Sequence, residues 1–164
     1  NHFPEADWIP HNVHSGLLRD VTEEVARTAG VHAASVEKDI KRGAWFAAQK
    51  HPGRTVASAA PEGWAKPVHV SIPYIPVGLA PHVARAIPDG SVLNLVREAS
   101  ESKPVVVAHQ ALVVRDGDQV LIRHSSRKGY IRTQSLLDYL RDMRGQGARE
   151  GWPLLGFNLN ALVK

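Results

Sequence analysis

The chain contains no cysteine among its 164 residues. This absence excludes a disulfide framework, a zinc site built on thiolates and a cysteine nucleophile within these residues. Long apolar runs are also missing: the longest reach about four residues, as in 105–108, whereas a spanning helix needs about 20. We therefore expect no membrane span. The chain has no signal-like segment and starts at Asn1, which we interpret as a piece of a larger product.

The composition is that of an ordinary globular protein, with 43% hydrophobic and 22% charged residues. A disordered or fibrous chain is excluded by these values. A chain of this length buries a core without disulfides or metals. We expect a single domain over residues 1–164.

The net charge of +4 is unevenly distributed. Residues 1–30 hold five acidic side chains against two arginines, whereas residues 123–149 hold seven Lys and Arg residues against two aspartates. A local basic surface indicates an anionic partner, and a merely solvated surface stays open as the alternative.

The first 66 residues are predicted to be rich in loops and helices. We expect an ordered loop over 1–20, because its two prolines interrupt any period and its aromatic residues are costly to expose. A short helix is predicted to end at Gly30 and a second helix to occupy 35–49. The Gly-, Pro- and Ala-rich residues 51–67 are predicted to form a loop.

Residues 67–164 carry the pattern of an antiparallel sheet. Alternation predicts a strand from Val68 that Pro73 and Pro76 close, a strand over 91–97 and a final strand over 154–163. A short helix is expected over 80–86. Ser135 with Asp138 predicts a capping box for a helix that ends at Gly145. The fold class predicted is α+β, an antiparallel β-sheet with flanking helices.

The segment 105–126 predicts a β-hairpin around Asp116-Gly117. A two-residue loop there pairs Arg115 with Asp118 and places His109 directly opposite His124, with their Cβ atoms about 5 Å apart. A three-residue loop would put the two histidines on opposite faces of the sheet.

Three explanations of this histidine pair stay open. The two residues are a catalytic base with its orienting partner, two ligands of a zinc ion, or core-edge histidines without a function. A zinc site needs a third ligand, and the sequence contains no HExxH or similar motif to supply one. We expect no metal and no cofactor.

The order of short motifs in the second half resembles that of NlpC-type papain-like cysteine hydrolases of bacterial cell walls. These motifs are His109-Gln-Ala-Leu-Val-Val, Leu121-Ile-Arg-His124-Ser-Ser, Gly129-Tyr-Ile and Leu136-Leu-Asp-Tyr-Leu. Five further motifs resemble the N-acetylmuramoyl-L-alanine amidase-like branch of that superfamily: Asn1-His-Phe, Asp7-Trp-Ile-Pro, Trp45-Phe46, Ser71-Ile-Pro-Tyr-Ile-Pro and Ile87-Pro-Asp-Gly. The resemblance covers nearly the whole chain.

The resemblance has one large gap. In these hydrolases the nucleophilic cysteine begins a helix upstream of the segment similar to Asn1-His-Phe, and this chain lacks that helix. No Gly-x-Ser-x-Gly motif offers a serine in its place. The resemblance therefore implies a papain-like core without its N-terminal helical part. The chain is either the larger C-terminal part of a hydrolase or an inactive relative.

For the hydrolase, the resemblance implies cleavage of the muramoyl–L-alanine amide of muropeptides. His109 would be the base and His124 its orienting partner, serving a cysteine outside this chain. Candidate substrate contacts are Trp8, Asn12, Tyr74 and Ser125. The expected partners are peptidoglycan fragments and an N-terminal segment of the same protein, and the expected location is the bacterial cell envelope, periplasmic or secreted.

Two rival functions remain. An inactive relative would act as a binding module for wall fragments or a protein. Nucleic-acid binding fits the basic pI of 9.6. However, aromatic residues are not interleaved with the basic ones, and the basic stretch spans a predicted loop and helix instead of a single face. We therefore expect no nucleic-acid partner.

Overall fold

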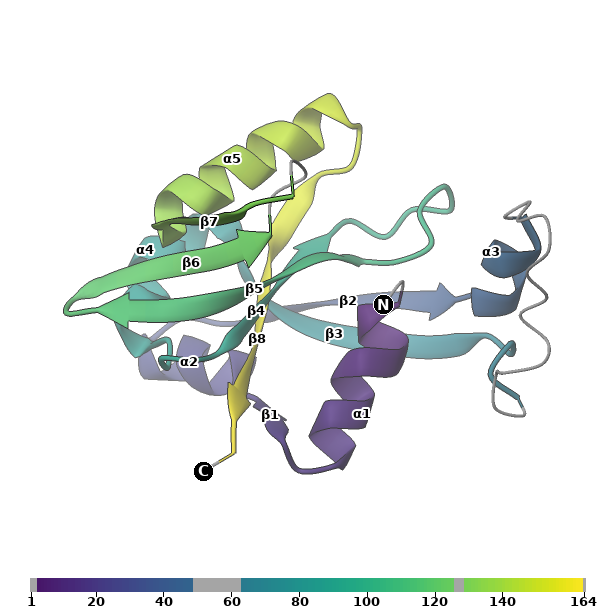
Figure 1. Ribbon diagram of the computed structural model, residues 1–164, viewed down its shortest axis with the longest axis horizontal. Coiled ribbons are helices and arrows are strands. Elements are labelled where there is room, and N and C mark those ends of the chain that lie inside the picture. Colours follow the sequence, from purple (N-terminus) through teal and green to yellow (C-terminus); the bar gives the residue numbers. More distant parts are fainter. Residues whose placement is uncertain (1–2, 49–62, 126–128, 164) are drawn as a thin grey trace.

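The computed structural model describes residues 3–48, 63–125 and 129–163. An eight-stranded antiparallel sheet forms its centre, in the order β2-β3-β8-β4-β5-β6-β7, with β1 paired to β8 (Figure 1). The strands are β1 (Leu18–Asp20), β2 (Ala34–Ile40), β3 (Val68–Pro76), β4 (Val92–Arg97), β5 (Val107–Asp116), β6 (Gln119–Ser125), β7 (Ile131–Ser135) and β8 (Leu154–Leu162). The helices are α1 (Ile9–His14), α2 (Thr22–Thr28), α3 (Arg42–Ala48), α4 (Ala80–Val83) and α5 (Leu136–Arg149). The predicted α+β class is confirmed.

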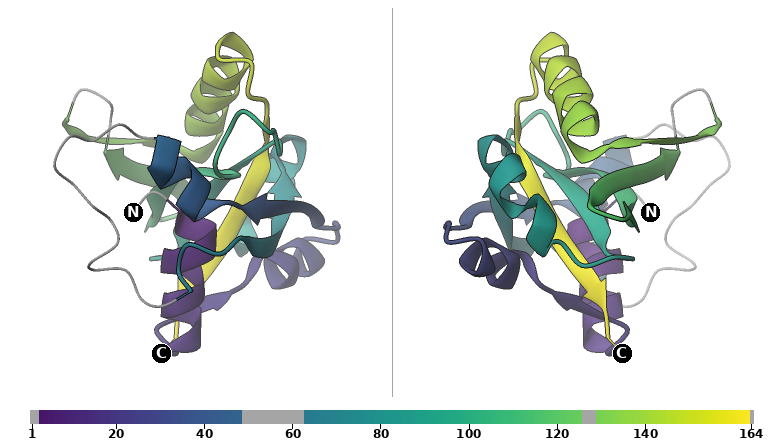
Figure 2. Two further views of the ribbon diagram at one scale, coloured as in Figure 1. Left: turned by 90° about the vertical axis from the view of Figure 1, so that its right-hand side faces the viewer. Right: turned by 90° about the vertical axis from the view of Figure 1, so that its left-hand side faces the viewer.

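The main hydrophobic core lies between the sheet and the helices α2, α4 and α5. The sheet contributes alternate residues such as Leu93, Leu95, Ala111 and Phe157, all 5% exposed or less. In Figures 1 and 2, α5 and α1 lie at opposite ends of the molecule. No described helix is long and apolar enough to cross a bilayer.

A second, aromatic cluster lies around Phe3. The rings of Trp45, Phe46 and Trp64 have centroids 5.4–6.3 Å from the Phe3 ring. Arg42 stacks over Trp64 at 5.0 Å and forms an ion pair with Asp7. These contacts hold α3 and the first turn of the chain against the sheet.

The predicted loop over 1–20 is wrong. Residues Pro4–Trp8 form a π-helical turn, α1 follows directly, and β1 occupies Leu18–Asp20. The two prolines that argued against a helix stand at the first positions of the turn and of α1. Proline is tolerated there because the first N–H groups of a helix have no intrahelical acceptor.

The predicted helix over 35–49 is also wrong in its first half. Residues Ala34–Ile40 form β2, which pairs with β3 over seven residues, and only Arg42–Ala48 are helical. Val36 and Ile40 are four residues apart, a spacing that fits both a helical period and every second position of a strand. Residues 51–62 of the predicted loop lie outside the described residues.

Helix α5 starts as predicted but ends later. The Ser135 hydroxyl accepts a hydrogen bond from the Asp138 N–H at 3.2 Å, so the predicted cap is confirmed. The helix continues through Gly145 to Arg149, and the glycine with a left-handed φ of +61° is Gly151. Gly147 lies inside the helix, and a side chain is excluded at this position because a Cβ would clash with the Arg97 guanidinium.

A ladder of amide side chains is buried in the middle of the sheet. Asn94 donates from Nδ2 to Asn158 Oδ1 at 2.9 Å and to Asn160 Oδ1 at 2.8 Å, and its Oδ1 accepts from Gln110 Nε2 at 2.9 Å. The three asparagines are at most 1% exposed. The ladder therefore ties β4, β5 and β8 together by side-chain hydrogen bonds in addition to the backbone ones.

A buried carboxylate joins the first turn to β5. Glu5 is 1% exposed, and its Oε1 accepts hydrogen bonds from the N–H groups of Val106 at 2.6 Å and Val107 at 3.4 Å. Its Oε2 is buried without a hydrogen-bond partner among the described residues. Burial raises the pKa of Glu5, partly offset by these backbone N–H groups.

We expect Glu5→Gln to stabilise the protein at neutral pH. The pKa of Glu5 is raised in the folded protein. Its contribution to the free energy of unfolding is therefore fully present below the unfolded pKa and is lost as the pH rises through the folded pKa. Glutamine does not ionise, so the variant keeps this stability at neutral pH. Its free energy of unfolding should exceed that of the wild type by about 1.4 kcal/mol for each pH unit by which the folded pKa of Glu5 exceeds the unfolded one. Melting temperatures at pH 7 and pH 4 measure the difference, which should shrink at pH 4.

The same change at Glu37, which is exposed on β2, is the control and should leave the melting temperature almost unchanged at both pH values. A wild-type protein that is more stable than Glu5→Gln at pH 7 would show that the ionised carboxylate is favoured in the fold.

Candidate functional site

The β5–β6 hairpin has a different register from the predicted one. Asp116 pairs with Gln119 and Val113 with Ile122, so the two loop residues are Gly117 and Asp118. Gly117 has a φ of +56°, and no described non-glycine residue has a positive φ. A turn with only its first central residue at positive φ is of the II′ kind, which places glycine first and moves the pairing by two residues.

The two histidines remain on one face despite this shift, because a shift of two residues keeps the strand alternation. His109 pairs with Leu95 on β4, and His124 pairs with Arg132 on β7. The imidazole centroids are 5.4 Å apart and the rings are almost perpendicular, at 88°. The predicted proximity of the rings is therefore confirmed, although the residues are diagonal rather than directly opposite.

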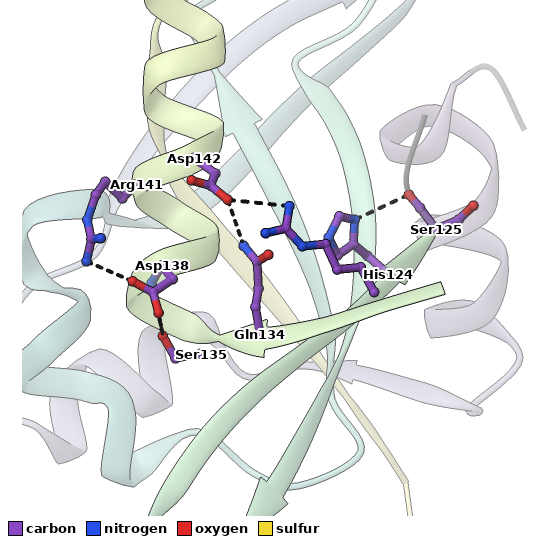
Figure 3. A network of polar contacts seen from close by, with 8 residues as sticks. His124, Ser125, Gln134, Ser135, Asp138, Arg141 and Asp142 are labelled. Carbon is purple, nitrogen blue, oxygen red and sulfur yellow. Dashed lines mark hydrogen bonds and ion pairs between the residues drawn. The ribbon is translucent and has the colours of Figure 1, made fainter. Parts of the chain in front are cut away.

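No hydrogen bond joins the two rings within the described part of the chain. The Nε2 atoms of both histidines are buried and have no hydrogen-bond partner among the described residues. Nδ1 of His124 lies 3.2 Å from the Ser125 carbonyl oxygen (Figure 3). A carbonyl oxygen only accepts, so this contact requires the proton on Nδ1 and makes Nε2 of neutral His124 an acceptor.

His109 is half-buried at an irregular point of the sheet. The β4–β5 register shifts between Leu95 and Val96, so Ala108 is left as the extra residue just before the histidine. Burial lowers the pKa of His109, and the nearby His124 lowers it further. The ring is therefore held neutral at neutral pH, the state in which it accepts a proton.

Two cavities meet at the end of β6. The first, of about 320 Å³, is lined by His109 and His124 together with side chains that include Arg97, Arg132 and Trp152. The second, of about 400 Å³, is lined by residues that include Trp8, Gln110, Leu112 and Arg123. His124 and Ser125 line both. The histidine pair thus lies beside a hollow that continues around the strand end.

The structure brings four of the six predicted site residues to these cavities: His109, His124, Ser125 and Trp8. Asn12 is on α1, where its side-chain amide donates to the Trp8 carbonyl at 2.7 Å. Tyr74 is on β3 and packs against the second hydrophobic cluster. Asn12 and Tyr74 line neither cavity.

A polar network between β7 and α5 borders the first cavity and was not predicted (Figure 3). Asp142 Oδ2 accepts from Gln134 Nε2 at 3.2 Å and lies 3.7 Å from an Arg132 nitrogen. The sequence does not predict Arg132 as a site residue, because only the β6–β7 register places it beside His124.

Tyr139 is the second unpredicted residue. Its ring centroid is 4.9 Å from that of His124, its side chain is fully buried, and its hydroxyl has no hydrogen-bond partner among the described residues. In the sequence Tyr139 lies three residues after Leu136 and four before Met143, a helical spacing that is typical of an ordinary core position.

The residues present fit proton transfer better than metal binding. No group of three or more His, Asp or Glu side chains that could hold a metal occurs in the described ranges. A neutral, half-buried imidazole beside a second imidazole can act as a general base. The chain contains no cysteine and no Gly-x-Ser-x-Gly motif.

Solved structures share this fold. LPG0564 from Legionella pneumophila str. Philadelphia 1 is 19% identical with a TM-score of 0.78, over 100% of this chain and 62% of that one. An N-acetylmuramoyl-L-alanine amidase from Bacteroides uniformis ATCC 8492 is 20% identical with a TM-score of 0.65, over 97% of this chain and 63% of that one. The chain thus spans less than two thirds of the length of either structure.

A search of curated proteins gives no match. Residues 1–146 match the family model described as AmiA-like, N-acetylmuramoyl-L-alanine amidase-like. The chain therefore belongs to the N-acetylmuramoyl-L-alanine amidase-like family.

Proposed function

We propose that this chain is the larger part of an NlpC-type cysteine hydrolase that cleaves the amide between the muramoyl lactyl group and L-alanine. The observation that carries the proposal is the histidine pair beside two cavities that meet at His124, with a base held neutral and no cysteine in the chain. Family membership and the share of the related structures that the chain leaves uncovered support it. The nucleophilic cysteine is assigned to a segment that precedes Asn1.

His109 moves the proton in this proposal. Its Nε2 is buried, which leaves Nδ1 as the nitrogen that faces an incoming thiol. Nδ1 takes the thiol proton while sulfur attacks the amide carbonyl carbon, and the imidazolium then protonates the departing L-alanine nitrogen. A water molecule then attacks the thioester carbonyl and gives its proton to His109, the carbon–sulfur bond breaks, and the departing cysteine sulfur takes that proton back from the imidazolium. Backbone N–H groups beside the cysteine would stabilise the oxyanion.

His124 orients His109 and must remain neutral to do so. A second imidazolium 5.4 Å away would repel the one that forms on His109. The contact from His124 Nδ1 to the Ser125 carbonyl fixes the ring orientation without adding charge.

The two cavities are proposed to receive the two halves of the substrate. Arg132 lines the first cavity and is about half exposed while paired with Asp142, so we propose that its exposed part binds the carboxylates of the stem peptide. Trp8 and Ser125 line the second cavity, where an aromatic face suits a sugar ring. Asn12 and Tyr74 line neither cavity, so we retain only Trp8 and Ser125 as proposed substrate contacts.

The proposal is tested by comparing this chain with a longer chain that includes the upstream segment. We expect the longer chain to release a peptide with a free L-alanine amino group from a defined muropeptide, measured by mass spectrometry. This chain alone should give no product above the buffer rate, because it supplies a base without a nucleophile. Alkylation of the cysteine should abolish the activity of the longer chain.

The alternative is an inactive relative that binds peptidoglycan fragments or a protein. Muropeptide binding without product formation by the longer chain would favour it, as would native protein that starts at Asn1 with no associated upstream fragment. Under either function we propose a location in the cell envelope or outside the cell, where peptidoglycan fragments occur.

A further inference from the structure

The buried hydroxyl of Tyr139 has no role in the steps above. Helix α5 is placed by its Ser135 cap so that Leu136, Tyr139 and Leu140 all face the sheet and are at most 2% exposed. A phenol buried without a hydrogen bond costs free energy that phenylalanine would avoid at the same position. Such a group needs an explanation beyond core packing.

The atoms around this hydroxyl are complementary to it. Nε2 of His124 is a buried acceptor without a partner, because the proton of the neutral ring is on Nδ1 toward the Ser125 carbonyl. The Tyr139 hydroxyl is a buried donor without a partner, on a ring 4.9 Å from the His124 ring. Burial raises the pKa of Tyr139 well above its ordinary value, so the phenol keeps its proton and remains a donor.

We propose that Tyr139 is the positioning residue of His124: its hydroxyl donates to one trapped water molecule that also accepts from the Nε2–H of His109 and donates to Nε2 of His124, and thereby holds the Nδ1–H tautomer. A trapped water is a common partner of buried polar atoms that are otherwise unsatisfied. The bond exists only while His124 is neutral, so it disfavours a charge on His124. Tyr139 thus protects the neutral state that the orienting residue requires.

The inference rests on the proposed role of His124 but is tested without measuring hydrolysis. Ring-nitrogen NMR on the 164-residue chain reports which nitrogen of His124 carries the proton, for the wild type and for Tyr139→Phe. We expect the wild type to show one tautomer, with the proton on Nδ1. In Tyr139→Phe we expect a mixture of tautomers, with the ratio shifted by about fivefold toward the proton on Nε2, the size of one hydrogen bond.

The variant changes only the hydroxyl. The titratable and charged groups that line the first cavity with His124, namely His109, Arg97, Arg132 and Glu150, are the same in both proteins. Tyr74→Phe, which removes a hydroxyl from a tyrosine that lines neither cavity, is the matched control and should leave the His124 signals unchanged. A second readout in the wild type is a slowly exchanging Tyr139 hydroxyl proton with a nuclear Overhauser effect to His124 or to a bound water.

An unchanged ratio of His124 tautomers in Tyr139→Phe, with an equal or higher melting temperature, would overturn the inference. That result would make Tyr139 a packing residue and leave His109 Nε2–H as the donor to His124. Absence of the slowly exchanging hydroxyl proton in the wild type would also count against it. Failure of the amidase assay would leave these spectra, and the inference, unaffected.

Discussion

Replacing His109 by alanine in the longer, cysteine-containing chain is expected to lower kcat on muropeptides by at least about a thousandfold. A general base of this kind is worth about 10² to 10⁴ in rate, and here it must both activate the thiol and protonate the leaving amine. KM should change little, because the imidazole is assigned to the reaction steps and not to holding the substrate. Steady-state kinetics with circular dichroism as a check of folding measure the effect.

His82→Ala is the matched control, since His82 is an exposed histidine on α4 that lines neither cavity. Its kinetics should equal those of the wild type. His124→Ala should lose activity by a smaller factor, about 10 to 100, because an orienting residue is partly replaceable. A His109→Ala enzyme with undiminished turnover would refute the assignment of the base.

The largest loss of stability is expected from Asn94→Ala. This side chain makes three hydrogen bonds in the amide ladder, and its removal leaves the buried Oδ1 atoms of Asn158 and Asn160 and the Gln110 amide without it. A buried polar group left unsatisfied costs about 1–3 kcal/mol, so the free energy of unfolding should fall by about 3 kcal/mol or more. The melting temperature should fall by about 6–12 °C.

Asn12→Ala provides the same chemical change in a different environment. Asn12 is half-buried, and its side chain donates one hydrogen bond, to the carbonyl of Trp8 directly before α1. Its removal should cost about 1 kcal/mol or less. Equal losses from the two variants would show that the ladder contributes no more than an ordinary amide contact.

The sequence predicts which residue types form the site better than it predicts how those residues are arranged. Two β-rich runs around Asp116-Gly117 with a two-residue loop predict His109 and His124 on one hairpin face, and the structure confirms that they are close. The register depends on which residue of the turn takes a positive φ. In the folded hairpin Gly117 has the positive φ and Asp118 has a negative φ.

What the sequence could not predict are contacts between distant segments. Tyr139 and Arg132 reach His124 from α5 and β7, and their own segments show only helix spacing and strand alternation. The prediction of a loop at the N-terminus was wrong for a different reason. Pro4 and Pro10 were interpreted as helix breakers, whereas each lies in the first turn of a helix. Local pattern identifies a residue type with a chemical capacity, whereas tertiary packing selects its partner.

The Glu5 contact has a kinetic consequence for the proposed enzyme. It fastens the first turn of the chain to the N–H of Val106, three residues before His109. A nucleophile carried on a segment joined to that turn meets its base as a tethered group, at an effective concentration in the millimolar range. A separate nucleophile fragment would need that concentration in solution, or its own binding energy, to reach the same rate.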